Sequence, residues 1–222
     1  MIYTSRYKYF NENSCFKTVS ISGDRGKKEG YKGKCYSKLA PKKEFWKVWH
    51  ENLLTVNQEQ NSRYYVSEYY KQVLSKLDPE EVYNELDNSI LVCYEPVREF
   101  CHRHIVAAWF EILLEVEVPE VVVDENFLVE ETNNTYKDYI KEYLIDAMMH
   151  ERIMNGYRSL RAVYLDEKAN KLEEELQQLD IKTGSHYNDL KQRIIYLRFE
   201  RDKAENKYYS KTNNPVRVRT DI

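Results

Sequence analysis

The stretch SILVCYEPVREFCHRHIVAAWFEILL, residues 89–114, contains the change of hydrophobic pattern that decides the fold. Its first part, Ile90 to Cys93, is a short continuous apolar run, which is typical of a buried strand. A polar loop with Pro96 follows, and from Cys101 onward the apolar residues recur at helical spacing. The stretch therefore predicts a strand, a loop and a helix. In an open α/β sheet, ligands bind at such a junction.

The first turn of this predicted helix carries Cys101, His102 and Arg103. A helix N-terminus has partial positive charge, so it stabilises a thiolate and disfavours an arginine unless an anion lies between them. We therefore expect His102 and Arg103 to help bind an anionic ligand, and Cys101 to be an activated nucleophile. The alternative is structural: Arg103 pairs with Glu95 or Glu99, and Cys101 and His102 only pack.

Further strand and helix patterns surround this stretch. Strands are predicted near residues 1–4, 16–21 and 118–123, and helices near 41–54, 61–77 and 79–86. This alternation predicts an α/β domain over residues 1–125, with a mostly parallel sheet flanked by helices on both faces. The carboxyl ends of parallel strands share one edge, so polar residues there should line one crevice. These candidate ligand-binding residues are Thr4, Ser5, Arg6, Ser20 and Ser22.

Residues 126–211 follow a different pattern, which is typical of long helices. No proline occurs between residues 135 and 214, and apolar side chains recur at steps of three and four. Gly184 interrupts the pattern, so we predict an antiparallel coiled-coil hairpin of two helices, residues 135–179 and 185–209, with Leu172 opposite Ile194. A flexible tail, residues 212–222, follows. The surface of residues 135–209 is a candidate for binding a protein partner or a second copy of the chain.

The spacing of two cysteines resembles that of a known family. Cys93-Tyr94-Glu95, followed by Cys101-His102-Arg103 and an apolar helix, resembles the C-x-E … C-H-R signature of the bacterial family called domain of unknown function 488. Ile2-Tyr3-Thr4-Ser5 and Leu39-Ala40-Pro41 resemble its opening strand and its L-x-P element. The resemblance covers residues 1–123 and implies an α/β fold without an established activity. Many members carry Asp-Val-Arg where this chain has Ser20-Ile21-Ser22, so an acid and a base are missing.

The charge of the chain is unevenly distributed. Its net charge is −3, but residues 1–50 hold 12 Lys or Arg and only 4 Asp or Glu. Aromatic residues lie among the basic ones between Arg25 and Lys47, which suits nucleic acid or a nucleotide, although such loops are also often only solvated. The glycines there fit neither G-x-G-x-x-G nor G-x-x-x-x-G-K-[ST], so no phosphate-binding loop is predicted. The candidate nucleic-acid-binding residues are Lys27, Lys28, Lys32 and Lys34.

Residue spacing argues against two kinds of site. A cysteine phosphatase or rhodanese needs an arginine six residues after its cysteine, and none stands there after Cys93 or Cys101. A metal site built from Cys93, Cys101, His102 and His104 is conceivable. However, neighbouring residues of a helix point in different directions, so residues 101, 102 and 104 should not converge. We therefore predict no metal and no cofactor, and we expect Cys93 to be a small buried apolar residue.

Two functions remain open from the sequence. The first is an enzyme-like domain that binds a nucleotide, a nucleic acid or another anion, with Glu95 as general acid or base beside Cys101 and Arg103. The second is a non-catalytic adaptor whose hairpin recruits a partner. The sequence shows no signal peptide and no apolar run long enough to span a membrane, so we expect a cytoplasmic protein without membrane contact. Four cysteines without a CxxC motif agree with a reducing compartment.

Overall fold

The computed structural model describes residues 1–10, 16–123, 129–132, 135–152, 156–179 and 183–212. Its contacts divide the chain into two units, Met1–Glu151 and Arg152–Ile222. This division differs from the predicted boundary at residue 125, because helix α5 (Thr135–Glu151) packs on helices α2 (Gln58–Gln72) and α4 (His102–Leu114). Residues 213–222, nearly all of the predicted tail, lie outside the described residues.

The first unit is built on a six-stranded sheet. Five strands run parallel in the order β3-β2-β4-β1-β5, and β6 pairs antiparallel with β5. The mostly parallel sheet confirms the predicted fold class, whereas β3 and β6 were not predicted. The apolar run at the start of residues 89–114 forms β4, which lies between β1 and β2 with all four of its side chains buried. The strands are β1 (Tyr3–Arg6), β2 (Thr18–Ser20), β3 (Lys34–Cys35), β4 (Ile90–Cys93), β5 (Glu120–Val123) and β6 (Val129–Thr132).

Two helices of this unit, α2 and α3, begin at residues whose side chains satisfy free amides. The Asn57 side chain accepts hydrogen bonds from two amides of α2, and Asp78 does the same for α3, which also has Pro79 at its first position. Helix α3 spans Pro79–Glu85, and the remaining helix of this unit that the structure describes is α1 (Lys43–Glu51). The single 3₁₀ turns are η1 (Tyr7–Tyr9), η2 (Lys27–Glu29), η3 (Ser37–Leu39), η4 (Asn52–Leu54) and η5 (Leu74–Lys76).

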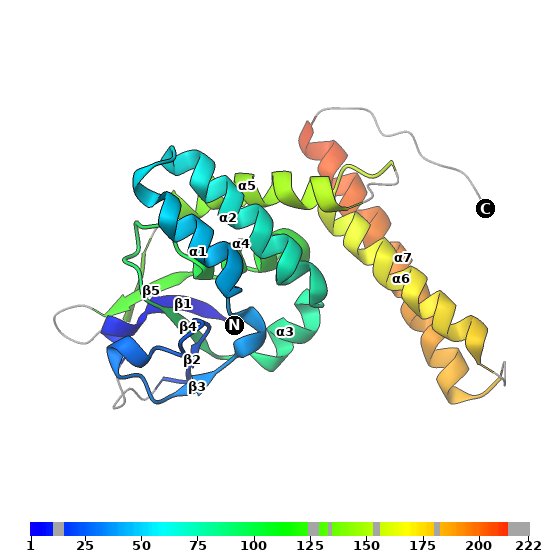
Figure 1. Cartoon of the computed structure of the whole chain (residues 1–222). Helices are drawn as coiled ribbons and strands as arrows, with labels where there is room; N and C mark the ends of the chain where they lie inside the picture. Colours follow the sequence, from blue (N-terminus) through cyan, green and yellow to red (C-terminus); the bar gives the residue numbers. More distant parts are fainter. Residues whose placement is uncertain (11–15, 124–128, 133–134, 153–155, 180–182, 213–222) are drawn as a thin grey trace. The chain divides into compact units, whose positions relative to one another are not determined.

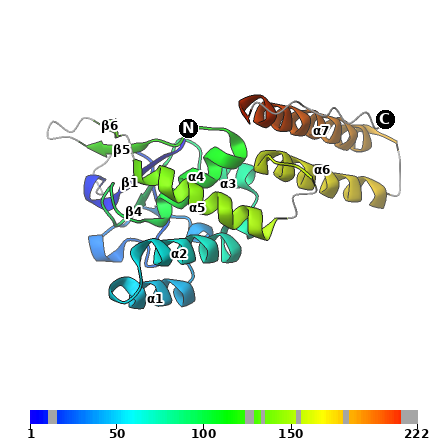
Figure 2. The same cartoon turned by 90° about the horizontal axis from the view of Figure 1, so that it is seen from above.

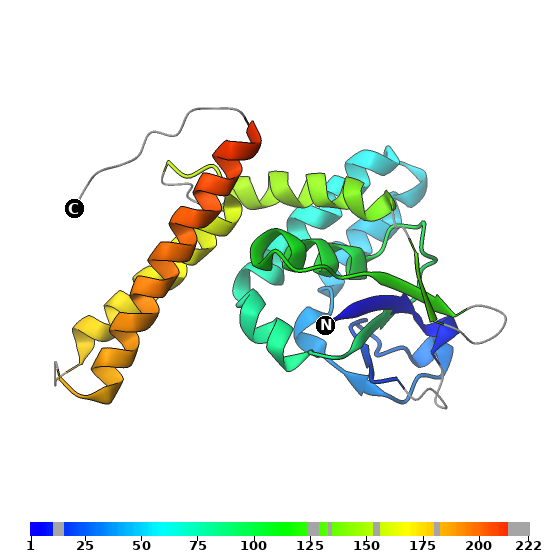
Figure 3. The same ribbon diagram turned by 180° about the vertical axis from the view of Figure 1, so that it is seen from behind.

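The two faces of the sheet are covered differently. Helices α1, α2, α4 and α5 lie on one side of it (Figures 1 and 3), with α1 and α2 side by side (Figure 2). On the other face, Ile90, Val92 and Val121 pack in one cluster with Tyr7 and Phe10. Among the described residues, ring side chains at and around η1 cover this face in place of an α-helix, which corrects the prediction of helices on both faces.

The second unit contains two long helices, α6 (Leu160–Gln178) and α7 (Ser185–Thr212). They lie against each other and run in opposite directions. Near one end the Arg158 amide donates to the Glu205 carboxylate, while near the other end His186 of α7 lies 3.6 Å from Glu175 of α6. Between them, Arg201 of α7 donates to Asp166 of α6.

The predicted single helix over residues 135–179 is wrong. Helix α5 ends at Glu151, and α6 begins after Ser159, whose hydroxyl accepts a hydrogen bond from the Ala162 amide. Gly156, with a φ of 83°, lies between them in a conformation that glycine adopts readily. The register that places Leu172 opposite Ile194 stays a prediction.

Within the part of the chain that the structure describes, no helix is both long enough and apolar enough to cross a membrane.

Candidate functional site

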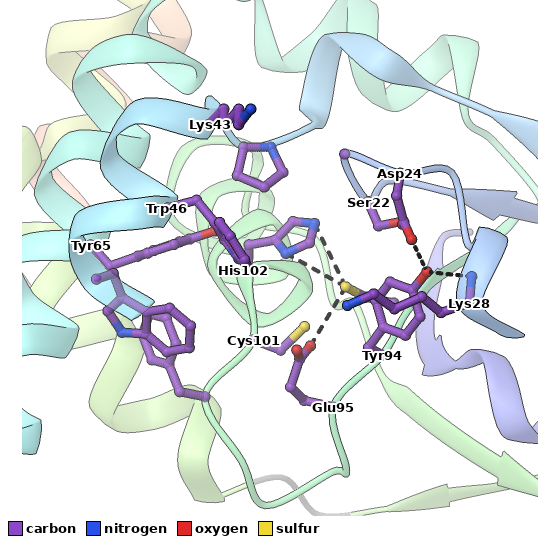
Figure 4. Close-up of a pocket in the computed structure, with 15 residues that line it drawn as sticks. Ser22, Asp24, Lys28, Lys43, Trp46, Tyr65, Tyr94, Glu95, Cys101 and His102 are labelled. Carbon is purple, nitrogen blue, oxygen red and sulfur yellow. Dashed lines mark hydrogen bonds between the residues drawn. The ribbon is translucent and has the colours of Figure 1, made fainter. Parts of the chain in front are cut away.

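A pocket of about 580 Å³ opens at the carboxyl ends of β2 and β4. It lies at the β4–α4 junction, between the loop that follows β2 and helices α1 and α2. Parallel strands and the helices that follow them place polar chain ends on this edge of the sheet. The lining residues that Figure 4 labels are Ser22, Asp24, Lys28, Lys43, Trp46, Tyr65, Tyr94, Glu95, Cys101 and His102.

Two cysteines, a histidine and a glutamate meet at the base of this pocket. The Cys93 sulfur lies 3.5 Å from Nδ1 of His102 and 3.7 Å from Oε2 of Glu95. Cys101, the residue before α4, also faces this group (Figure 4), and its sulfur does not cap the helix. The ligating atoms of Cys93, Cys101 and His102 all lie within 4.8 Å of one another. We call these four residues the Cys-His-Glu cluster.

Burial and mutual contact shift the pKa values of this cluster in opposite directions. Burial opposes ionisation of Cys101, but the Cys93 hydrogen bond and the charges of Arg103 and His102 outweigh it and lower the pKa of Cys101 well below its usual range. Burial raises the pKa of the Cys93 thiol. Burial and the neighbouring Cys101 raise the pKa of Glu95 to about 8. Within the cluster, ionisation is therefore favoured at Cys101 over Cys93, and Glu95 retains its proton more strongly than an ordinary glutamate.

One wall of the pocket is aromatic. Helix α1 contributes Trp46 and Trp49, α2 contributes Tyr65, and Phe100 closes the wall beside Cys101. The Trp49 and Tyr65 rings lie 5.4 Å and 5.1 Å from the Phe100 ring. Trp46 stacks on His50 and remains 40% exposed. The wall therefore presents an accessible ring surface to a ligand.

The facing wall is polar and carries Lys28, whereas Lys43 lies at the start of α1, the helix that also carries Trp46. The Tyr94 hydroxyl donates to Asp24 at 2.5 Å, and this bond joins the loop after β4 to the loop after β2. The loop conformation depends on Gly26, which has a φ of 74°. A Cβ atom at this position would lie only 2.7 Å from the Cβ of Tyr31, so the loop has no room for a side chain there. This wall is thus a loop that a hydrogen bond joins to the end of β4.

Arg103 does not reach this pocket. Its side chain is fully buried, and its Nη2 and Nε atoms lie 2.9 Å and 3.0 Å from Oε1 of Glu120 on β5. This position corrects the expectation that Arg103 binds the ligand directly. An ion pair inside the protein was the structural alternative, but the partner is Glu120 rather than Glu95 or Glu99.

Several other predicted site residues bond inside the protein. Thr4 donates to Glu120 Oε2 at 2.6 Å, and Ser5 donates to the Val121 carbonyl at 2.5 Å. The Ser20 and Ser22 hydroxyls both contact the Tyr7 hydroxyl, at 2.6 Å and 2.7 Å. Of the predicted strand-end residues, only Ser22 lines the pocket.

The guanidinium of Arg6 lies 6.0 Å from the Tyr9 ring centre. Lys27, Lys28, Lys32 and Lys34 are all exposed, and only Lys28 lines the pocket.

The prediction that residues 101, 102 and 104 do not converge applies to His104. His104 lies away from Cys101, with its Nε2 3.6 Å from Glu120, as helix geometry requires. Cys101 and His102 nevertheless converge with Cys93, because Cys93 approaches from the end of β4 and Cys101 precedes the helix. The predicted divergence therefore applies to His104, and the absence of a metal stays a prediction.

A comparison with protein families covers the part of the chain that holds this site. A family model described as "Active DUF488-N3 subclade" matches residues 4–112. Residues 4–112 belong to the DUF488 family. The DUF488 segment contains β1 to β4 and nearly all of α4, so it includes the pocket and the Cys-His-Glu cluster. Glu120, the partner of Arg103, lies beyond it. No curated protein and no solved structure matches the chain.

Proposed function

We propose that the pocket binds a phosphate-bearing ligand of nucleotide type. The observation that carries this proposal is an aromatic wall in a pocket that two lysines, Lys28 and Lys43, also line. A volume of about 580 Å³ is in the range of small-molecule pockets. A mononucleotide needs a ring surface for its base and positive charge for its phosphate, and this pocket offers both.

Trp46 is the residue to which we assign base stacking. It lines the pocket, and its exposure leaves ring surface available for a ligand. Stacking of a base on an aromatic side chain contributes roughly 1–3 kcal/mol and tolerates any base. Lys28 and Lys43 would attract the phosphate, and Asp24 could accept a hydrogen bond from a sugar hydroxyl or a base amine.

We place the chemistry on this ligand at Glu95 and Cys101. Both side chains face the pocket, and Glu95 is positioned to exchange a proton with a bound molecule. The description of the matching subclade as active favours an enzyme over a simple binding domain.

Binding is tested by titrating nucleosides and nucleotides while following tryptophan fluorescence and heat. Trp46→Ala should weaken both kinds of ligand about tenfold or more, whereas Lys43→Gln should weaken only the nucleotides. Lys47→Gln is the matched control, because Lys47 lies one helical turn from Lys43 and pairs with Glu51. Equal affinity of the wild type and all three variants would remove the proposal.

A second candidate function is self-association through the second unit. Helix α7 exposes Ile195, Tyr196 and Phe199, each 58–63% accessible, which is unusual for three large apolar side chains so close in sequence. We propose that α6 and α7 form a coiled-coil hairpin and that this α7 surface binds a second copy. Light scattering should then show a dimer that Phe199→Ser converts to monomer. A monomeric wild type at high concentration would exclude it.

A further inference from the structure

The Cys-His-Glu cluster brings together groups that all offer electron pairs. The Cys93 sulfur lies near His102 Nδ1 at 3.5 Å, near Glu95 Oε2 at 3.7 Å and near Cys101. Cys93, Cys101 and His102 are buried. Each thiol holds at most one proton, so these groups can share few hydrogen bonds among themselves. A cation would satisfy all of them at once.

The orientation of His102 points to the same conclusion. Its Nε2 lies 3.0 Å from the carbonyl oxygen of Ile21, an acceptor, so Nε2 carries the proton and donates it. In the neutral ring, Nδ1 then keeps its lone pair, and Nδ1 is the ring nitrogen nearer to Cys93. Histidines that bind metals usually donate their other ring N–H to a carbonyl or carboxylate in this way.

The separations also fit tetrahedral coordination. In a zinc site, Zn–S bonds of about 2.3 Å and Zn–N bonds of about 2.0–2.1 Å place sulfur and nitrogen roughly 3.5 Å apart. A Zn–O bond of about 2.1 Å places sulfur and oxygen roughly 3.6 Å apart. The Cys93–His102 and Cys93–Glu95 distances of 3.5 Å and 3.7 Å match these values.

We propose that Cys93, Cys101 and His102 bind a zinc ion at the base of the pocket. Two thiolates and one imidazole form a donor set that selects zinc over harder cations such as Mg²⁺. Three protein ligands leave the fourth position to Glu95 or to a small molecule in the pocket. This open position would bind an anionic oxygen of the nucleotide-type ligand, a step that rests on the proposed function. Cys101 then takes part in the proposed chemistry as a ligand of the metal beside the bound molecule.

The metal is tested on the full-length protein, without any assay of activity. The protein should carry about one zinc per chain, and after chelation it should bind Co²⁺ with the intense near-ultraviolet absorption of thiolate-to-cobalt charge transfer. Cys93→Ser and Cys101→Ser should each reduce this absorption by about half and weaken Co²⁺ binding at least tenfold. His102→Ala should weaken binding but keep both thiolate bands. Cys35→Ser is the matched control, because Cys35 is free and exposed.

Two further variants separate the metal from folding and from the ligand. Glu95→Gln keeps all three proposed ligands, so it should retain Co²⁺ binding. This result can be obtained even if one of the serine variants fails to fold. Trp46→Ala should lose the nucleotide-type ligand and keep the metal. The metal site would be overturned if the folded wild type with Co²⁺ showed no thiolate bands. It would also be overturned if Cys35→Ser lost as much of this absorption as Cys93→Ser and Cys101→Ser. Loss of ligand binding alone would overturn only the proposed function.

Discussion

Arg103 and Glu120 form an ion pair in which almost no surface of either side chain is exposed, with 2.9 Å between Nη2 and Oε1. The pair joins the first turn of α4 to β5. Thr4 of β1 donates to the same carboxylate, so three elements meet at one acidic group. The start of α4, and with it the positions of Cys101 and His102, therefore depends on a residue that lies outside the pocket.

Glu120→Gln should destabilise the first unit strongly. Removing one partner of a buried ion pair leaves the other charge uncompensated, which costs about 3–5 kcal/mol. The free energy of unfolding from urea titration measures this loss. Glu117→Gln, which changes an exposed carboxylate three residues earlier, should alter it by less than about 0.5 kcal/mol. A small effect of Glu120→Gln would show that water reaches Arg103.

The same carboxylate should give stability a defined pH dependence. Burial opposes ionisation of Glu120, but its contacts with His104 and Arg103 outweigh burial and lower its pKa in the folded state. In the unfolded chain the pKa is about 4.3, so the stabilisation is complete above that pH and is lost as pH falls through the lower folded-state value. The difference in unfolding free energy between wild type and Glu120→Gln should be constant from pH 6 to about pH 5 and shrink below about pH 4. A difference that grows with acid would contradict this assignment.

Glu111 of α4 should hold α5 against α4. Its carboxylate binds Lys137 at 2.6 Å and Lys141 at 3.1 Å, both on α5. Hydrogen bonds to charged groups contribute about 1.5–3 kcal/mol. Glu111→Gln should therefore speed amide hydrogen exchange along α5 more than in the sheet. Glu142→Gln, on an exposed position of α5, should leave exchange unchanged.

The exposed lysines of the loop after β2 allow a test of nucleic-acid binding. If single-stranded nucleic acid binds there, affinity should fall with roughly 0.7 power of salt concentration per phosphate contacted. Changing Lys27, Lys32 and Lys34 together to Gln should flatten this dependence and leave mononucleotide binding intact, because these three residues do not line the pocket. No binding by the wild type at low salt would end the hypothesis.

Local sequence patterns predicted the parts of the fold that short segments determine. The apolar run of β4 and the helical spacing of α4 are visible in sequence because each is fixed by neighbours a few residues away. They place the strand–helix junction where the pocket lies. The end of α5 was missed, although Gly156 and Ser159 are ordinary signals for a helix end and a helix start.

Contacts between distant segments could not be predicted in the same way. Trp46 and Trp49 lie in the helix predicted near residues 41–54, and nothing local shows that a pocket lies beside them. Cys93 and Cys101 are separated by a loop whose course sets their distance. The partner of Arg103 had one sequence signal, since Glu120 is an acidic residue inside an apolar strand and such residues need a buried cation.

The pocket is assembled from four separate segments: the loop after β2, helix α1, helix α2 and the β4–α4 junction. It therefore cannot exist in a chain that has formed only some of these elements. A molecule that binds there stabilises the whole first unit by mass action, by about 2.7 kcal/mol at a hundred times its Kd. A thermal-shift screen of metabolites can thus identify the natural ligand before any reaction is known.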